Sequence, residues 1–172
     1  MLFSCKNDLT VIQSLSITDS VPDEIAYDIE LMYSDSGKVK AFLKSPSMVR
    51  QGTEDPVVEF PDGFKVIFYD SIDRPESEIT ARYGIMYEAE KKMEAKNNVV
   101  VRNIDKQEML ETEHLIWDRK SGIIYSDVFI KITKPDQVIF GDGLRSDQNF
   151  ESYEIKNPTG ELSIYPDDEE KK

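Results

Sequence analysis

Residues 110–126 read LETEHLIWDRKSGIIYS, a stretch that begins and ends with the same three-residue pattern. In Leu110-Glu111-Thr112 and Ile124-Tyr125-Ser126, an apolar residue is followed by any residue and then by a small or β-branched one. Outward from this stretch, further copies start 14 to 17 residues apart: Ile79-Thr80-Ala81, Met93-Glu94-Ala95, Ile139-Phe140-Gly141 and Tyr153-Glu154-Ile155. The last copy departs from the pattern because Ile155 stands where a small residue is expected.

These intervals leave room for two short strands and two turns, but not for the helices that connect parallel strands. The repeat therefore predicts an all-β domain of stacked short antiparallel strands, in which each unit buries an apolar stripe against its neighbours. Such a stack keeps an unpaired strand edge at each end.

Alternation of apolar and polar residues predicts two hairpins before the repeat. Residues 29–33 and 39–43 are expected to pair across the turn at 34–37, with Pro46 ending the second strand. Val57–Phe60 and Phe64–Tyr69 are expected to pair across Pro61-Asp62-Gly63, since proline and glycine favour a tight turn there.

Two segments allow other interpretations. Residues 86–97 are rich in Glu, Ala and Lys, which favours a helix, but no N-cap residue precedes them and Gly84 stands at their start. We therefore predict mostly strand. Gly141-Asp142-Gly143-Leu144 is superficially like a phosphate-binding loop, yet no helix follows to hold a phosphate, so a β corner is predicted.

Charge excludes several kinds of partner. The chain has 172 residues, with 21 Lys and Arg against 34 Asp and Glu, and its net charge is −13 at pH 7. This charge disfavours nucleic acid and anionic bilayers. The longest apolar run, at 66–69, is far shorter than the roughly 18 residues of a membrane-spanning helix, so a soluble body is expected.

Residue types that support catalysis are scarce. One histidine, His114, and one cysteine, Cys5, provide neither a zinc ligand set nor a thiol nucleophile within the folded body. No Gly-x-Ser-x-Gly motif occurs, and carboxylate pairs are unavoidable among 34 acidic residues. We therefore expect no enzymatic activity, no cofactor and no metal.

Apolar side chains on one face of the predicted strands are the candidate binding residues. The same alternation suits a filled core or an apolar slot between two faces. Trp117 shares a face with Leu115, which favours a core position over a sugar-stacking platform. The candidate groove residues are Phe64, Val66, Phe68, Ile79, Tyr83, Val99, Val101, Leu115, Trp117 and Ile130.

The two ends of the chain suggest an anchor and a docking edge. Leu2-Phe3-Ser4-Cys5 resembles a bacterial lipobox, which predicts a lipid on Cys5, the alternative being a free thiol in a frayed terminus. We expect a tether over 1–24, the β domain over 25–165 and an acidic tail over 166–172. The docking edge is predicted in the last repeat, at Phe150, Tyr153, Ile155, Leu162 and Ile164.

Four segments resemble those of the LptC family, periplasmic components of the lipopolysaccharide export bridge that are related to the OstA-like domains of LptA. They are Glu108–Asp118, Ile124–Asp127, Gly141–Asp147 and Tyr153–Asn157. The resemblance, which covers roughly 29–164, implies a single twisted antiparallel β-jellyroll with open edges and an apolar groove for the acyl chains of lipid A.

The same resemblance implies where the protein works and with which partners. We expect it in the periplasm, anchored to the inner membrane, docking its N-terminal edge onto the lipopolysaccharide ABC transporter and its C-terminal edge onto an LptA-like jellyroll. Two alternatives stay open. A secreted carbohydrate-binding or hydrolytic β-sandwich requires Trp117 and a carboxylate pair in one cleft, whereas a structural β-solenoid adaptor has the same edges around a filled interior.

Overall fold

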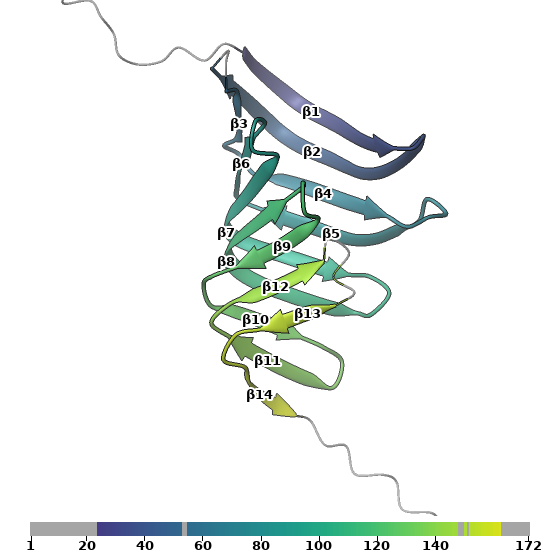
Figure 1. Cartoon of the computed structure of the whole chain (residues 1–172), viewed down its shortest axis with the longest axis vertical. Coiled ribbons are helices and arrows are strands. Elements are labelled where there is room, and N and C mark those ends of the chain that lie inside the picture. Colours follow the sequence, from purple (N-terminus) through teal and green to yellow (C-terminus); the bar gives the residue numbers. More distant parts are fainter. Residues whose placement is uncertain (1–23, 53–54, 148–149, 151, 163–172) are drawn as a thin grey trace, which may run out of the picture.

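The computed structural model describes residues 24–52, 55–147, 150 and 152–162, and every regular element within them is a β-strand. The antiparallel strands form one continuous sheet, stacked along the long axis from β1 to β14 (Figure 1). The predicted all-β jellyroll is confirmed. The strands are β1 (Glu24–Asp35), β2 (Lys38–Gln51), β3 (Val57–Phe60), β4 (Phe64–Tyr69), β5 (Pro75–Ala81), β6 (Tyr83–Tyr87), β7 (Lys92–Asn103), β8 (Glu108–Asp118), β9 (Ile123–Ser126), β10 (Ile130–Thr133), β11 (Gln137–Gly141), β12 (Leu144–Asp147), β13 (Tyr153–Ile155) and β14 (Thr159–Leu162).

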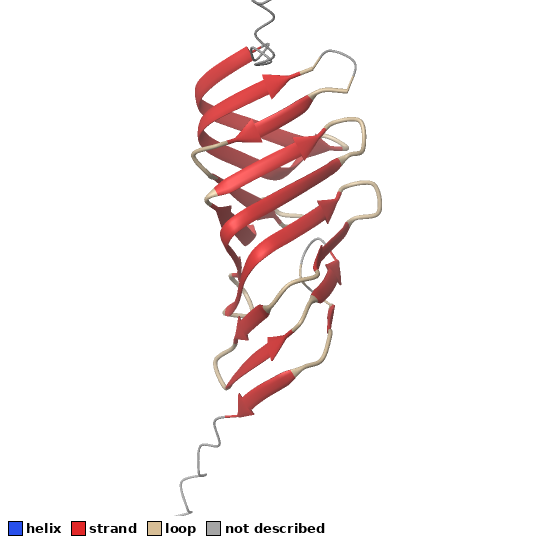
Figure 2. Cartoon of the chain, turned by 90° about the vertical axis from the view of Figure 1, so that its left-hand side faces the viewer, coloured by secondary structure: helices blue, strands red, loops and turns tan. Residues whose placement is uncertain are grey.

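The sheet folds over into two layers because its longest strands belong to both. Residues 92–96 of β7 pair with β6, whereas 100–103 of the same strand pair with β5. Layer A consists of β3, β6, β9, β12 and β13 with the adjoining halves of β2, β7 and β8. Layer B consists of β4, β5, β10, β11 and β14 with the other halves. Seen from the side, the strands lie one above another across the long axis (Figure 2).

The chain passes between the layers along a single row of bends, which we call the bend line. In β7, Asn97 and Asn98 have φ values of 64° and 53° and interrupt the ladder with β8. Two residues of β7 thus lie opposite Glu113 alone, which is a β-bulge that turns the strand. The bend line comprises residues 28 and 46, 61–63, 82, 97–98, 113, 127–129, 142–143 and 156–158.

Every copy of the repeated sequence motif ends one or two residues before the bend line. Its small third residue is the last inward-facing position before the layers converge, as at Ala81, Ser126 and Gly141, where β5, β9 and β11 end. A methyl group added at Gly141 would overlap the side chain of Ile155, the residue that departs from the motif. The close approach of the layers therefore requires small residues at the third position of the motif. Ile155 is the one large residue there, and the missing side chain of Gly141 leaves space for it.

Buried hydroxyl groups satisfy backbone carbonyls where the bends interrupt the ladder. Thr112 Oγ1 donates to the carbonyl oxygen of Phe129 at 2.9 Å, and Ser45 Oγ lies 2.7 Å from that of Gly63. Because a buried carbonyl without a partner is unfavourable, these side chains replace missing main-chain hydrogen bonds. Ser45 ends a further copy of the motif, Leu43-Lys44-Ser45, which lies in β2 before the first predicted copy.

The first predicted hairpin is confirmed, but its predicted end is wrong. β1 and β2 pair around the turn at Ser36-Gly37, and β2 continues through Pro46 to Gln51. Pro46 lies opposite Asp28, whose φ is 52°, at the point where the bend line crosses both strands. The ladder is interrupted there, so a residue without an N–H group is tolerated inside the strand.

The second predicted hairpin is wrong. Pro61-Asp62-Gly63 forms a turn, with the Gly63 N–H donating to the Phe60 carbonyl at 3.2 Å, but the strands that it joins are not paired with each other. β3 pairs with β2 and β6, and β4 pairs with β2 and β5. The turn is instead a corner between layers, which sequence signals do not distinguish from a hairpin.

The two ambiguous segments are resolved as predicted. Residues 86–97 contain the end of β6, a turn over 88–91 and the first half of β7. Gly141-Asp142-Gly143-Leu144 is a corner between β11 in layer B and β12 in layer A. A Cβ atom at Gly143 would lie 2.7 Å from the carbonyl oxygen of Ser126, so this corner requires glycine.

Candidate functional site

An apolar cavity lies between the two layers near β1. Its volume is about 210 Å³, and both layers contribute side chains, with β1 beside them. Leu31 and Tyr33 on β1 are 39% and 54% exposed although their register directs them inward, so the cavity opens toward solvent on this side. The lining residues are Leu31, Met32, Tyr33, Ala41, Leu43, Val66, Met86, Met93, Trp117 and Arg119.

Two of the predicted groove residues line this cavity. Val66 on β4 and Trp117 on β8 line it from opposite layers. A third predicted groove residue, Phe68 on β4, does not line the cavity but packs against Trp117, with ring centroids 5.4 Å apart in an edge-on arrangement. Such edge-on pairs are favourable, so Phe68 holds the indole in place.

Six other predicted groove residues lie in the core and do not line the cavity. Each is at most 6% exposed, and together they fill the space between the layers beyond the cavity. They are Phe64, Ile79, Val99, Val101, Leu115 and Ile130.

Tyr83 has surroundings unlike those of the other candidates. It follows the bend at Arg82, and its hydroxyl donates to Glu59 Oε2 at 2.7 Å on the outer side of layer A. Burial and the Glu59 carboxylate raise the pKa of Tyr83 to about 12. A strand bend of this kind reverses the alternation, and period-two reasoning across it therefore fails.

Several cavity residues were not identified from the sequence. Leu31 and Tyr33 were assigned only to a hairpin, and Met86 and Met93 lie in the segment with helical propensity. Arg119 follows Leu115 and Trp117 at the same period of two, a signal that identifies it once β8 is extended by one residue.

The space between the layers is filled toward the C-terminal end. Phe150 is 6% exposed and packs into the core, although its sequence position predicted a docking residue. The void beside it measures only about 20 Å³, room for about one water molecule. The cavity near β1 is thus not continuous with an open channel toward β13 and β14.

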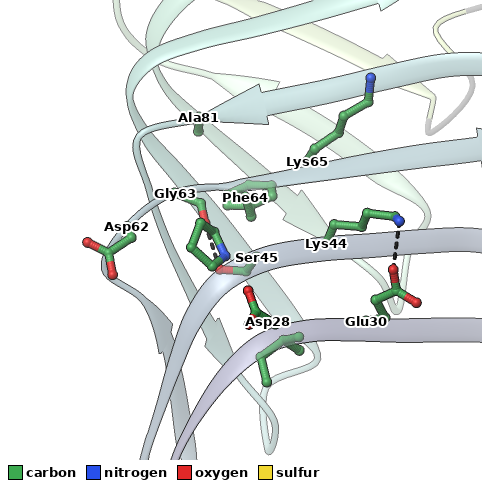
Figure 3. A pocket seen from close by; sticks show the side chains of 11 residues that line it. Asp28, Glu30, Lys44, Ser45, Asp62, Gly63, Phe64, Lys65 and Ala81 are labelled. Carbon is green, nitrogen blue, oxygen red and sulfur yellow. Dashed lines mark hydrogen bonds and ion pairs between the residues drawn. The ribbon is translucent and has the colours of Figure 1, made fainter.

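A larger pocket of about 520 Å³ lies at the bend line beside β1, β2 and β4. Figure 3 shows its charged residues, with Lys44 Nζ 2.6 Å from Glu30 Oε1 and Ser45 bonded to Gly63. Asp28, Asp62 and Lys65 also line it. This mixture of charges suits a solvated surface better than acyl chains. Among the described residues, no group of three or more potential ligands is placed to hold a metal ion.

Three strands have an unpaired edge within the described part of the chain. β1 pairs only with β2, β13 only with β12, and β14 only with β11. Tyr153 and Ile155 on β13 are half-buried, and Tyr153 faces Lys134, whose ammonium lies 5.3 Å from the ring centroid. Leu162 ends β14, whereas Ile164 and Cys5 lie outside the described residues.

The cavity does not fit a carbohydrate site. Trp117 is half-buried against Phe68, and no carboxylate is among the residues that line the cavity. Sugar hydrolysis requires a pair of carboxylates beside the substrate.

One protein-family model matches most of the chain. The family model described as "Lipopolysaccharide-assembly, LptC-related" matches residues 2–159. No curated protein matches the sequence significantly. Within the described residues, no helix is long and apolar enough to cross a membrane.

Proposed function

This chain belongs to the LptC family, and from that premise we propose that its cavity between the layers receives lipopolysaccharide acyl chains during export. Members of the family are transport components associated with the inner membrane on its periplasmic side. The observation that carries the proposal is the apolar cavity near β1, which both layers line and which opens toward solvent.

Burial of acyl chains supplies the binding energy in this proposal. Each methylene group removed from water contributes about 0.8 kcal/mol, so the binding energy increases with the length of acyl chain that the cavity buries. Met86 and Met93 suit this role because methionine side chains adapt to differently shaped apolar ligands. Trp117 adds a large, rigid apolar surface on the layer A side.

Passage of lipid toward the C-terminal end requires the layers to separate. The closed core around Val101 and Ile130 occupies the path that a chain would follow from the cavity. In our proposal the isolated protein therefore has the conformation that accepts an acyl chain at the cavity. Docking of the next jellyroll then favours a conformation in which the two layers are further apart.

The unpaired strand edges are the proposed docking sites. The β1 edge would add to the jellyroll of the inner-membrane ABC transporter, and the edges of β13 and β14 to an LptA-like jellyroll. Main-chain hydrogen bonds provide affinity in such strand addition, and alternate side chains provide specificity. On β1, Ile25, Tyr27 and Met32 are 52%, 73% and 64% exposed, which gives that edge apolar contacts to offer.

A lipid on Cys5 is the proposed membrane anchor. Support comes from the Leu2-Phe3-Ser4-Cys5 sequence and from the acidic body, which provides no electrostatic attraction to an anionic bilayer. Metabolic labelling with a radioactive fatty acid tests the anchor. A Cys5→Ala protein that retains the label would contradict it.

Site-specific photo-crosslinking in cells tests the cavity. A photoreactive amino acid at Leu43, Val66 or Trp117 is expected to form an adduct with lipopolysaccharide. The same amino acid at Lys65 or Lys131, which lie on the outer faces, is the matched control. Equal capture at both sets would contradict the slot and favour a structural adaptor with a filled interior.

The docking edges are tested in the same way. A crosslinker at exposed Glu154 on β13 is expected to capture the LptA-like partner, and one at exposed Met32 on β1 the transporter. Glu111, which lies on β8 in the middle of layer B, is the control position. Capture of either partner from Glu111 but not from the edges would place docking on a sheet face.

A further inference from the structure

A polar network joins the two layers in the C-terminal half of the molecule. Glu108 Oε1 lies 3.1 Å from Lys134 Nζ, and the Tyr153 hydroxyl donates to Glu108 Oε2 at 3.3 Å. Glu108 begins β8 and Lys134 follows β10, both in layer B, whereas Tyr153 begins β13 in layer A. Each residue lies at the end of its strand away from the bend line, so the network closes the rim where the two layers face each other.

A second contact joins the same rim. Lys106, in the turn between β7 and β8, donates from Nζ to the Phe150 carbonyl oxygen at 3.2 Å, and the Phe150 ring packs into the core. Glu108, Phe150 and Tyr153 line the void of about 20 Å³, so these residues form the outer wall of the interior. We call the contacts among Lys106, Glu108, Lys134, Phe150 and Tyr153 the rim latch.

The ion pair of the rim latch occupies positions that strand alternation assigns to the core. Glu108 lies two residues before buried Leu110 on β8. Lys134 lies two residues after buried Ile132 on β10, and residues two apart on a strand share a face. The Glu108 and Lys134 side chains are only 18% and 21% exposed. Hydrogen bonding with Tyr153 and with Glu108 raises the pKa of Lys134 above its ordinary value, so the ammonium stays charged although it is mostly buried.

A polar contact separates at a lower cost than an apolar one. Apolar side chains that part expose surface to water without compensation. When an ion pair or a hydrogen bond separates, water hydrates both partners, and the net stabilisation that is lost is small. Apolar residues at these positions would hold the closed state as well or better. The polar residues therefore suit an interface that opens.

We propose that the rim latch holds the two layers closed in the isolated protein, and that its opening extends the cavity near β1 toward β13 and β14. The inference rests on the proposed function, because it assigns the contacts that break when the layers separate. β7 and β8 run through the bend line and belong to both layers, so the bend line is the hinge and the rim is where the layers part.

Pulsed electron paramagnetic resonance measures the separation of the layers at the rim. Nitroxide labels are attached to Asp136→Cys in layer B and Glu154→Cys in layer A, both exposed, in a Cys5→Ser background. Tyr153→Phe removes the hydrogen bond to Glu108 but retains the ring, and Lys134→Glu replaces the ion pair by two carboxylates. Each should shift the label distances to longer values. Lys134→Glu combined with Glu108→Lys exchanges the charges and should restore the native distances. Circular dichroism confirms that each variant is folded.

Lys131→Glu is the matched control, because Lys131 pairs with Glu111 at 2.9 Å on the outer faces of the same two strands. Native distances are expected in this variant. Unchanged distances in Tyr153→Phe and Lys134→Glu, or an equal shift in Lys131→Glu, would overturn the rim latch. The measurement involves no lipid, so that result would leave the proposed function intact. Failure to capture lipopolysaccharide at Val66 and Trp117 would instead contradict the proposed function, whatever the label distances.

Discussion

Single residues at the bend line determine how closely the two layers approach. Positions that face inward beside a bend have small side chains or hydroxyl groups, because the layers converge there and the ladder is interrupted. Gly84 shows the same requirement in layer A, since a Cβ atom there would lie 2.6 Å from the ring of Phe64. Larger side chains at these sites are therefore expected to destabilise the fold by steric overlap with the opposite layer, not by exposing apolar surface.

Gly141 and Ile155 provide a test of this requirement. Gly141→Ala should lower the free energy of unfolding by about 1–3 kcal/mol, the usual cost of forcing an extra methyl group into a packed site. Ile155→Ala in the same molecule removes the overlapping side chain and should recover part of that loss. Urea denaturation of the two single variants and the double variant measures the coupling. Strictly additive effects would show that the two residues do not share one space.

Glu78, on the outer face of layer B, makes a pH-dependent contribution to the free energy of unfolding. Hydrogen bonds from Lys65 and then Arg102 hold its pKa below the ordinary value of 4.5. A pKa lowered in the folded state means that stability is gained above pH 4.5 and lost as the pH falls through the folded-state value.

Glu78→Gln should therefore lower the free energy of unfolding by about 1 kcal/mol at neutral pH. The difference from the native protein should decrease as the pH falls below 4.5. Denaturation curves across this range measure it, with exposed Glu154→Gln as the control. A difference that stays constant with pH would show that the effect is not due to ionisation.

Long strands that bend are the elements that define this fold. β2, β7 and β8 each contribute to both layers, and each changes layer at the bend line. β7 does so through two residues with positive φ, a conformation that asparagine tolerates better than other non-glycine residues. The Asn98 N–H is bonded to a Glu113 side-chain oxygen at 3.1 Å instead of to the ladder.

Asn98 therefore tests whether the bend is a backbone requirement. Asn98→Ala should lower the free energy of unfolding by about 1 kcal/mol, because alanine disfavours positive φ. Asn98→Gly should be close to neutral, since glycine adopts this conformation without a steric cost. Thermal or urea denaturation of the two variants distinguishes them. Equal destabilisation would attribute the effect to the lost amide side chain.

At the scale of the whole molecule, the two layers enclose a single packed core and, near β1, a cavity that is open to solvent. The layers enclose a packed interior around Phe60, Ile124 and Ile130, whereas the interior near β1 is exposed through Leu31 and Tyr33. Because β7 and β8 belong to both layers, neither layer can unfold while the other stays intact. We expect a single cooperative transition.

Ile130→Ala tests this coupling. Ile130 is fully buried on β10, so its truncation should lower the free energy of unfolding by about 2–5 kcal/mol. The same shift should appear in far-ultraviolet circular dichroism, which reports all strands, and in the fluorescence of Trp117 at the cavity. A Trp117 transition that does not move with the other signal would show that the cavity end unfolds independently.

The sequence by itself determined the strand content, the repeating unit and the family, because apolar periodicity and small residues before each turn are local properties of the chain. Val66 and Trp117 were also recognised in this way as inward-facing residues. The sequence also predicted the pairing of β1 with β2, but the partners of β3 and β4 were decided only by the tertiary structure: Pro61-Asp62-Gly63 has the composition of a hairpin turn but forms a corner between layers. The cavity could not be predicted from the sequence either, because apolar and polar residues alternate in the same way around Ile130 and around Val66. Only the placement of β1 in the tertiary structure leaves open space beside Val66, whereas Ile130 lies in the closed core.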